Sequence, residues 1–506
     1  MFEDLVDAAG GASDAAAVAA WARIENAACA RRLSAAADVL DRHYAADGSA
    51  ERDQWIEDNW WAVAAEIAPA QNVSPGMAAA QLGVAVALRD RLPRVNTVFV
   101  TGALTYRMVA AIVSRTWLIE DPQLLAQVDA AIAADVAGWT TLSVERLRTE
   151  VDYWVDHFDP AALRRSEARS RDRCLDVKDP RDGSGVAHLE GTLYSHDADL
   201  IDTRLEAMAA TVCPNDPRTL DQRRSDAMTA VFHGAHTLAC ACGSKDCPAA
   251  GTAPTAVVVH VVATENTVAE ATPARLDGPH PPANDDPTHT GDTPCDASHT
   301  APVTGPSAAG PGYVFGNRAV LPAPVVAATL AGAKRRPVIH PGDAPPERRR
   351  IPSALLAWFI RCRDLTCRFP GCSKPATRCD IDHTIPYPRG ATQASNLKCL
   401  CRAHHLFKTF WGWRDQQHPD GTVDWISPQG QRYTTHPGSR LLFPTLCRPT
   451  APAVVDHTVD LLDDAVRCLK MPRRKQTRAQ NRAHAIADER RRNQPHADER
   501  HRPPPF

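Results

Sequence analysis

Residues 361–413 read RCRDLTCRFPGCSKPATRCDIDHTIPYPRGATQASNLKCLCRAHHLFKTFWGW. This segment contains two close pairs of soft metal ligands, Cys367 with Cys372 and Cys401 with His404. The first pair flanks a Pro-Gly turn, which lets two thiolates converge, and the second lies three residues apart at a predicted helix start. Three cysteines and one histidine in two pairs are typical of a structural zinc site with no position open for substrate. Free buried thiols are the alternative, but they do not explain the pairing.

A second pattern runs through the same residues: Asp382-His383, then Asn396, then His405. Successive helical residues diverge by about 100°, so His404 can face the zinc ion while His405 points into a different cavity. If residues 379–385 form a strand, Asp382 and His383 start on opposite faces, and local twist must bring them together. A carboxylate oxygen and an imidazole suit Mg²⁺, Mn²⁺ or a borderline metal.

These side chains fit the hydrolysis of phosphodiester bonds. That chemistry needs a base to take a proton from water and a cation to stabilise charge on the phosphate and the leaving oxygen. His383, with an ordinary pKa near about 6.5, is the predicted base. Asp382 and His405 are the predicted ligands of a single divalent cation. Asn396 is predicted to fix the loop between strand and helix through hydrogen bonds to the backbone.

The motifs RDLTCRFPGC, CDIDHTIPY, NLKCLCRAHHLFK and WGW together resemble those of the HNH endonucleases, which share the ββα-metal fold. More narrowly, they resemble the actinobacterial 13E12-repeat proteins, which join an N-terminal domain of unknown function (number 222) to a C-terminal HNH module. The N-terminal half is similar in Leu92-Pro93, in Gly102 and in the string DPRT…QRRSDA over residues 216–227. The resemblance covers most of the chain.

The resemblance implies a zinc-stapled HNH nuclease module between about residues 361 and 414. It assigns the general base to His383, the divalent metal to Asp382 and His405, and the ordering role to Asn396. It assigns the structural zinc to the four ligands named above. Three further thiols lie nearby, and the choice between Cys401 and Cys399 as ligand stays open; the other two are Cys362 and Cys379.

Several nearby side chains are weaker candidates. Arg389, Arg402 and Lys408 flank the predicted site, and they either contact phosphates or are merely solvated. Trp411 and Trp413 are predicted to pack against the ββα unit rather than to stack on bases.

A second group of metal-binding residue types occurs in HGAHTLACACGSKDC, residues 233–247. Its spacing suits another zinc ion, although a cysteine-rich loop is an ordinary alternative. The candidate ligands are His233, His236, Cys240, Cys242 and Cys247.

The 506 residues exceed what one hydrophobic core usually supports, so two folded regions with linkers are expected. The predicted fold class is a mostly α N-terminal domain with a small α+β element, then a zinc-stapled ββα-metal (HNH) module, with a disordered linker and basic tail. The predicted boundaries are 1–268 for the mostly helical domain, 269–312 for a Pro/Thr/Asp-rich linker or insertion, 313–355 for a connecting segment, 356–440 for the HNH module and 441–506 for the C-terminal extension.

Within the first domain, Ser74-Pro75 is a typical helix start, with serine as N-cap and proline in the first turn, and Pro93 marks the end. Two short helices around Gly102 suggest either a helix-turn-helix or ordinary bundle packing, and the lack of a basic recognition face favours the bundle. Arg223, Arg224 and Asp226 are candidates for an ion-pair network or for a solvated helix face. Further helices are predicted at 105–116, 122–136, 199–212 and 221–233, and a buried strand at 256–263.

Charge and composition narrow the functional class. The net charge is only −3, but residues 331–440 carry 18 Lys and Arg against 8 Asp and Glu, and residues 471–506 carry 10 against 4. This basic C-terminal part either faces a polyanion or is an ordinary solvated surface of mixed charge. The polyanion predicted by the nuclease hypothesis is double-stranded DNA. The N-terminus does not look like a secretory signal, and no apolar run is long enough to span a membrane. Because no export signal is expected, the fifteen cysteines indicate free thiols and metal ligands rather than disulfides. A cytoplasmic protein, which could associate with the nucleoid, is expected.

Three functional hypotheses follow. The first is a metal-dependent HNH endonuclease acting on DNA. The second is a catalytically silent, zinc-stabilised DNA-binding protein. The third is a partner-dependent assembly protein that acts through its helical domain, which could also self-associate.

Overall fold

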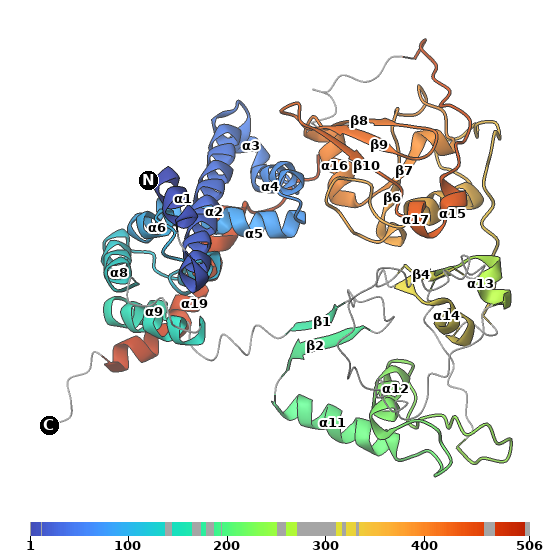
Figure 1. Cartoon of the computed structure of the whole chain (residues 1–506), viewed down its shortest axis with the longest axis horizontal. Coiled ribbons are helices and arrows are strands. Elements are labelled where there is room, and N and C mark those ends of the chain that lie inside the picture. Colours follow the sequence, from blue (N-terminus) through green and yellow to red (C-terminus); the bar gives the residue numbers. More distant parts are fainter. Residues whose placement is uncertain are drawn as a thin grey trace, which may run out of the picture.

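The computed structural model describes residues 2–11, 13–136, 144–163, 174–178, 187–193, 195–249, 260–270, 310–315, 320–329, 333–459 and 471–500. Helices dominate its N-terminal part, and small antiparallel sheets lie in the middle and C-terminal parts (Figure 1). Among the described residues, no helix combines the length and the apolar character needed to cross a membrane.

The N-terminal part is a bundle of helices around a core that includes Leu33, Phe99 and Ile112. Polar side chains start several helices: Ser74 accepts a hydrogen bond from the Met77 N–H, as predicted for the cap before Pro75. The helices are α1 (Phe2–Gly10), α2 (Asp14–Ala45), α3 (Ser49–Arg52), α4 (Asn59–Ala70), α5 (Pro75–Asp90), α6 (Pro93–Val100), α7 (Tyr106–Arg115), α8 (Pro122–Asp135) and α9 (Val144–Phe158), followed by the short 3₁₀ turn η2 (Pro160–Ala162).

The turn between α6 and α7 depends on Gly102. Its φ of +80° is in the left-handed region, and a Cβ there would lie 2.1 Å from the carbonyl oxygen of Arg23. Both helices bury their apolar faces in the bundle, including Val95 of α6 and Val109 of α7. This packing favours the bundle interpretation over a helix-turn-helix.

The middle part contains two small sheets and two helical pairs. Strands β1 (Cys174–Lys178) and β2 (His188–Thr192) pair antiparallel, and α11 (Ser195–Ala209) packs on α12 (Leu220–Phe232). A three-stranded sheet has the order β3 (Val261–Val262), β4 (Gly312–Val314), β5 (Val320–Leu321), and it is accompanied by α13 (Glu265–Glu270) and α14 (Ala323–Thr329).

This sheet bears on the choice between a linker and an insertion at residues 269–312. Because β3 pairs directly with β4, the segments before and after the predicted linker form one structural unit. Residues 271–309 of that linker, and residues 256–259 of the predicted strand, lie outside the described residues. Of the two predicted alternatives, linker or insertion, the pairing of β3 with β4 favours the insertion.

The C-terminal part begins with α15 (Ala354–Asp364) and a turn, η3 (Ala376–Arg378). Strand β6 (Asp380–His383) pairs antiparallel with β7 (Leu397–Leu400) after the turn η4 (Ala394–Asn396), and α16 (Arg402–Phe410) follows at once. A three-stranded meander, which was not predicted from the sequence, comes next: β8 (Arg414–Gln417), β9 (Val423–Ile426) and β10 (Arg432–Thr435), followed by α17 (Ser439–Leu442) and η5 (Pro444–Cys447).

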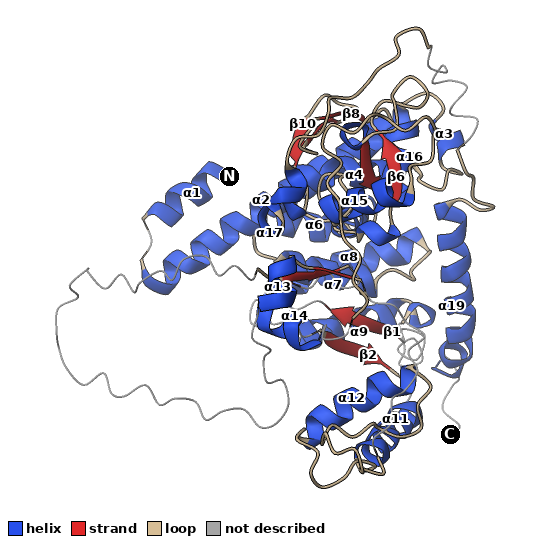
Figure 2. Ribbon diagram, turned by 90° about the vertical axis from the view of Figure 1, so that its right-hand side faces the viewer, coloured by secondary structure: helices blue, strands red, loops and turns tan. Residues whose placement is uncertain are grey.

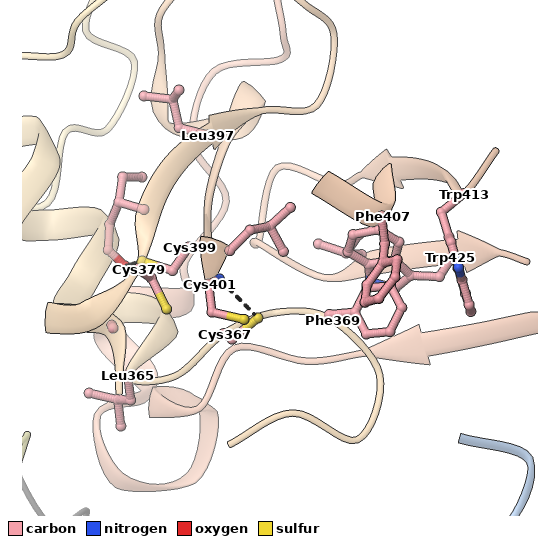
Figure 3. Close-up of a cluster of buried hydrophobic side chains, with 14 of the residues drawn as sticks. Leu365, Cys367, Phe369, Cys379, Leu397, Cys399, Cys401, Phe407, Trp413 and Trp425 are labelled. Carbon is pink, nitrogen blue, oxygen red and sulfur yellow. Dashed lines mark hydrogen bonds between the residues drawn. The ribbon is translucent and has the colours of Figure 1, made fainter. Parts of the chain in front are cut away.

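Aromatic packing joins these small elements into one core (Figure 3). The ring of Phe369 lies edge-on to Trp413 and to Trp425, with centroids 4.6 and 5.3 Å away. Trp411 instead packs against Trp55 of the N-terminal part, and its indole N–H donates to the carbonyl of Glu57. The packing role predicted for the two tryptophans is confirmed, but Trp411 faces the helical bundle.

The prediction that the basic tail is disordered is wrong over residues 478–500. These residues form α19 (Arg478–Arg500), which lies beside the N-terminal helices (Figures 1 and 2). Ile486 enters the bundle core, and Arg490 donates to Asp159 at 2.6 Å. The side-chain amide of Asn493 also donates to the carbonyl of Ala161. Few apolar residues suffice here because polar side chains satisfy buried carbonyl and carboxylate groups.

Arg490→Ala should loosen α19. The buried carboxylate of Asp159 would lose its charged partner, at a cost of about 2 kcal/mol. Amide hydrogen exchange over residues 478–500 should accelerate, whereas Arg491→Ala, which removes an exposed side chain, should leave it unchanged. Equal exchange in both variants would contradict the proposed docking contact.

Candidate metal centre and pocket

Four side chains converge in the C-terminal part with the donor atoms of a metal site. The ligand atoms of Cys367, Cys372, Cys401 and His404 all lie within 4.8 Å of one another, so the set could hold a metal ion. His404 Nδ1 is 3.4 Å from Cys367 Sγ and 3.3 Å from Cys401 Sγ. Tetrahedral coordination with ordinary bond lengths separates such ligand atoms by about 3.5 Å. The predicted ligand set is therefore brought together by the fold.

The local sequence positions these ligands. Cys401 precedes α16 and His404 lies in its first turn, so the two share one side of the helix. Phe369 stacks flat on the His404 ring at 4.0 Å, which restricts the ring's rotation. Figure 3 shows Cys367 beside Cys401, where the Cys401 backbone N–H donates to the Cys367 sulfur.

The other nearby thiols do not join this group. Cys399 points into the core, where burial raises its pKa well above the ordinary value. Cys379 has its sulfur near the carbonyl of Pro375, and Cys362 is buried in the core with a pKa raised to about 12 by burial. Cys401, rather than Cys399, is thus the cysteine that the fold places with Cys367, Cys372 and His404.

Asp382 lies at the centre of a buried charge network. Lys398, its cross-strand partner, approaches Asp382 Oδ2 at 3.0 Å, and Lys408 of α16 approaches the same oxygen at 2.7 Å. Both lysines also contact Asp415 of β8. Burial opposes the ionisation of Asp382, but the two ammonium groups outweigh it and hold its pKa well below the usual range. Asp382 is therefore a carboxylate at neutral pH.

The other oxygen of Asp382 faces His405. His405 Nε2 is 3.3 Å from Asp382 Oδ1, and its Nδ1 is 3.1 Å from the carboxylate of Asp380. In the tautomer that donates from Nδ1 to Asp380, the lone pair of Nε2 points toward Asp382. Such a carboxylate–histidine pair commonly orients a metal ligand. In that tautomer Nε2 of His405 and Oδ1 of Asp382 are two acceptor atoms that can share a cation.

His383 lies next to this pair and borders the same pocket. Its Nε2 is 2.8 Å from the hydroxyl of the buried Thr392, which leaves Nδ1 as the remaining ring nitrogen. Burial lowers the pKa of His383 to about 4, against the opposing effect of Asp382. The ring is therefore neutral at pH 7, by a wider margin than its ordinary pKa suggested.

Asn396 orders the loop after β6, as predicted. Its side-chain oxygen accepts from the Ile385 N–H at 2.8 Å, and its amide donates to the carbonyls of Ile385 and Ala391. The residue is fully buried. These bonds hold the backbone that follows His383 and place Asn396 outside direct contact with the pocket chemistry.

A pocket of about 700 Å³ opens over these residues. Its wall includes Arg350, Arg361, Asp382, His383, Tyr387 and His405. Asp382 and His383 thus border one pocket although they are neighbours on a strand.

The three basic residues predicted to contact phosphates are placed differently from one another. Lys408 lines the pocket but is bound to Asp382 and Asp415, whereas Arg402 is exposed and lies 3.6 Å from Asp380. Arg389 is not among the residues that line the pocket. Arg350 and Arg361 do line it, and neither was predicted from the sequence; the run Glu-Arg-Arg-Arg at 347–350 was the available signal.

The second cysteine group contains a different set of residues from the predicted one. The ligand atoms that lie within 4.8 Å of one another belong to Cys213, Cys240, Cys242 and Cys247. His233 and His236 are not part of this set, and His236 lies instead beside Arg204. The prediction missed Cys213 because it lies 27 residues before Cys240 in the sequence.

Comparison with known families identifies the N-terminal part. Residues 9–285 match the family model described as "Domain of unknown function (DUF222)". The chain belongs to the DUF222 family. This confirms the N-terminal part of the resemblance found in the sequence.

Relatives of this DUF222 protein are similar along nearly the whole chain. The "Uncharacterized protein Rv2100" of Mycobacterium tuberculosis (strain H37Rv) is 46% identical over 498 residues, covering 97% of this chain and 89% of the relative. The "Uncharacterized protein Rv3776" of the same strain is 44% identical over 509 residues, covering 98% and 92%. No solved structure matches the chain.

Lys398→Met in this DUF222 protein should destabilise the C-terminal part. The variant leaves two buried carboxylates, Asp382 and Asp415, without one of their cations, and breaking such a network costs about 3–5 kcal/mol. The midpoint of thermal unfolding should fall clearly, whereas Lys475→Met at an exposed position should leave it unchanged. An unchanged midpoint for Lys398→Met would show that the network contributes nothing.

Proposed function

We propose that this protein is a metal-dependent HNH endonuclease that hydrolyses phosphodiester bonds of DNA. The observation that carries the proposal is the meeting of Asp382, His383 and His405 at one pocket. Strand β6 supplies Asp382 and His383, and helix α16 supplies His405; with β7 between them in the chain, the elements follow the order expected of a ββα-metal module. The motifs that resemble HNH endonucleases and the 13E12-repeat proteins coincide with these elements.

The ion at the Cys₃His cluster is proposed to be zinc with a structural role. Three thiolates and one imidazole suit zinc, and four protein ligands leave no position for substrate. The cluster ties the loop carrying Cys367 and Cys372 to the start of α16. The same helix carries His405, so the zinc ion would fix the position of the neighbouring site.

A single divalent cation such as Mg²⁺ or Mn²⁺ would be held by Asp382 Oδ1 and His405 Nε2. The donor atoms fit, because Lys398 and Lys408 occupy only the other oxygen of Asp382. When bound, the cation would stabilise negative charge on the phosphate and on the leaving oxygen.

His383 acts as the general base in this proposal. Its neutral ring accepts a proton from a water molecule while the water oxygen forms a bond to phosphorus. The bond between phosphorus and the leaving oxygen breaks, and that oxygen takes a proton from solvent. Thr392 holds Nε2, so the proton would go to Nδ1. Water is therefore the only reactant that the hydrolysis consumes besides the phosphodiester.

Double-stranded DNA is the proposed substrate. Arg350 and Arg361 at the pocket wall supply positive charge for the phosphate backbone, and Arg350 is exposed. The basic excess over residues 331–440 extends this surface.

Cys401→Ala should unfold the C-terminal module rather than merely slow it, because binding of a structural zinc ion is part of the folding free energy. The variant should lose one zinc ion, part of its far-UV signal and its cooperative melting. A strong chelator should do the same to the wild type. Melting of Cys401→Ala that matches wild type would contradict the structural role.

Plasmid cleavage tests the catalytic assignment. Purified wild type should relax or linearise supercoiled plasmid with Mg²⁺, Mn²⁺ or Ni²⁺ and should be inactive in EDTA. His383→Ala should lower the rate by at least about a hundredfold, the usual contribution of a general base. His405→Ala should keep the fold and lose metal-supported turnover.

The control is His418→Ala, which removes a histidine that lies outside the pocket wall and pairs with Asp424. If wild type and His383→Ala both leave the plasmid intact with every metal but retard it in a gel, the module is a DNA-binding scaffold. Equal cleavage by both proteins would contradict the role of His383.

A further inference from the structure

We propose that Cys213, Cys240, Cys242 and Cys247 bind a second zinc ion, which staples the α11–α12 unit of the DUF222 region. The four sulfurs lie within 4.8 Å of one another and come from two segments of the chain. This site is separate from the pocket, so it does not depend on nuclease activity.

The spacing of the sulfurs fits a shared ion. Cys213 Sγ and Cys240 Sγ are 3.5 Å apart. Two thiolates on one tetrahedral zinc ion are separated by about 3.8 Å, since each Zn–S bond is about 2.3 Å long. A disulfide would need about 2.05 Å, and all four cysteines are free.

Backbone hydrogen bonds close the loop that carries three of the four cysteines. The N–H of Cys240 donates to the carbonyl of Ala249, and the N–H of Cys247 donates to the carbonyl of Ser244. Gly243, with a φ of +74°, makes the turn that follows Cys242.

A buried ion pair holds the two cysteine-bearing segments together. Asp216 accepts from two nitrogens of the Arg218 side chain and from the N–H of Ala241, which lies between Cys240 and Cys242. Arg218 also donates to the carbonyl of Ala239 and to Asp226. The contacts with Ala239 and Ala241 bring the 239–242 backbone toward the loop that carries Cys213.

This arrangement explains the string DPRT…QRRSDA over residues 216–227. The predicted network of Arg223, Arg224 and Asp226 is only partly correct, because Arg218 is the arginine that pairs with Asp226. Arg224 pairs with Asp202 of α11, and Arg223 donates to the backbone of Arg218. The aspartate–arginine pair thus preorganises the ligand loop.

The ion would have a structural role. Four thiolates complete a tetrahedron and leave no open position for water or substrate. The unit has few buried side chains of its own, among them Met208, Ala227 and Leu238. A small unit with so little core is typically stabilised by a metal ion or by disulfides.

Metal analysis of the full-length chain tests the proposal. Wild type purified under reducing conditions should contain two zinc ions per chain by inductively coupled plasma mass spectrometry. Cys242→Ser should contain one, and hydrogen exchange over residues 238–249 should become faster. Cys174→Ser, which removes an exposed thiol outside both clusters, should keep two, as should His236→Ala.

X-ray absorption at the zinc edge gives a readout that does not depend on any variant. Two ions with Cys₄ and Cys₃His ligands have seven sulfur neighbours and one nitrogen neighbour in total. Three results would overturn the proposal. They are iron in place of zinc, a Cys242→Ser variant that retains two ions, and a wild type whose single ion is lost in Cys401→Ala. If the wild type contains a single ion and Cys242→Ser loses it, the proposal for the Cys₄ site is supported. The assignment of zinc to the Cys₃His cluster would then be wrong.

Discussion

The position of α16 is the constraint on which the candidate site depends. His404 and His405 are adjacent on this helix, and the rotation of about 100° between them sends one to the cysteine cluster and the other to Asp382. Any rotation or sliding of the helix would move both groups at once. The cluster, the stacked ring of Phe369 and the contact of Lys408 with Asp382 together fix the helix against β6 and β7.

Because both lysines contact the same oxygen, the two carboxylate oxygens of Asp382 have different surroundings. Oδ2 is neutralised and held by Lys398 and Lys408, whereas Oδ1 stays directed toward His405. A buried carboxylate without these cations would tend to protonate and would lose its value as a ligand. The same network ties β8 to Lys398 and Lys408 through Asp415, so the unexpected three-stranded meander helps to hold the two lysines that contact Asp382.

Prediction from the sequence succeeded best where a residue type at a given spacing has few alternative roles. The paired cysteines, the two adjacent histidines and Asn396 could be assigned by spacing and chemistry, and the structure brings them together as expected. Helix starts with a good cap, such as Ser74, were also predictable. The partners of Asp382 could not be found in this way, because Lys398 depends on strand register and Asp415 on a strand far along the chain.

Long-range contacts account for the remaining errors. Cys213 and Cys240 are distant in sequence, so the second cluster was assigned to nearby histidines instead. The tail has a composition typical of disorder, yet Ile486, Arg490 and Asn493 suffice to dock α19 on the bundle. In each case the deciding contacts join residues that are far apart in the sequence, and no local pattern reveals them.

We propose that Asp382 and His405 hold one divalent cation beside His383. Crystals soaked in Mn²⁺, with anomalous data collected on both sides of the manganese absorption edge, test it most directly. We expect a manganese peak bonded to Asp382 Oδ1 and His405 Nε2, with both lysines still on Oδ2. A map with no peak there, and with His405 in direct hydrogen bond to Asp382, would contradict it.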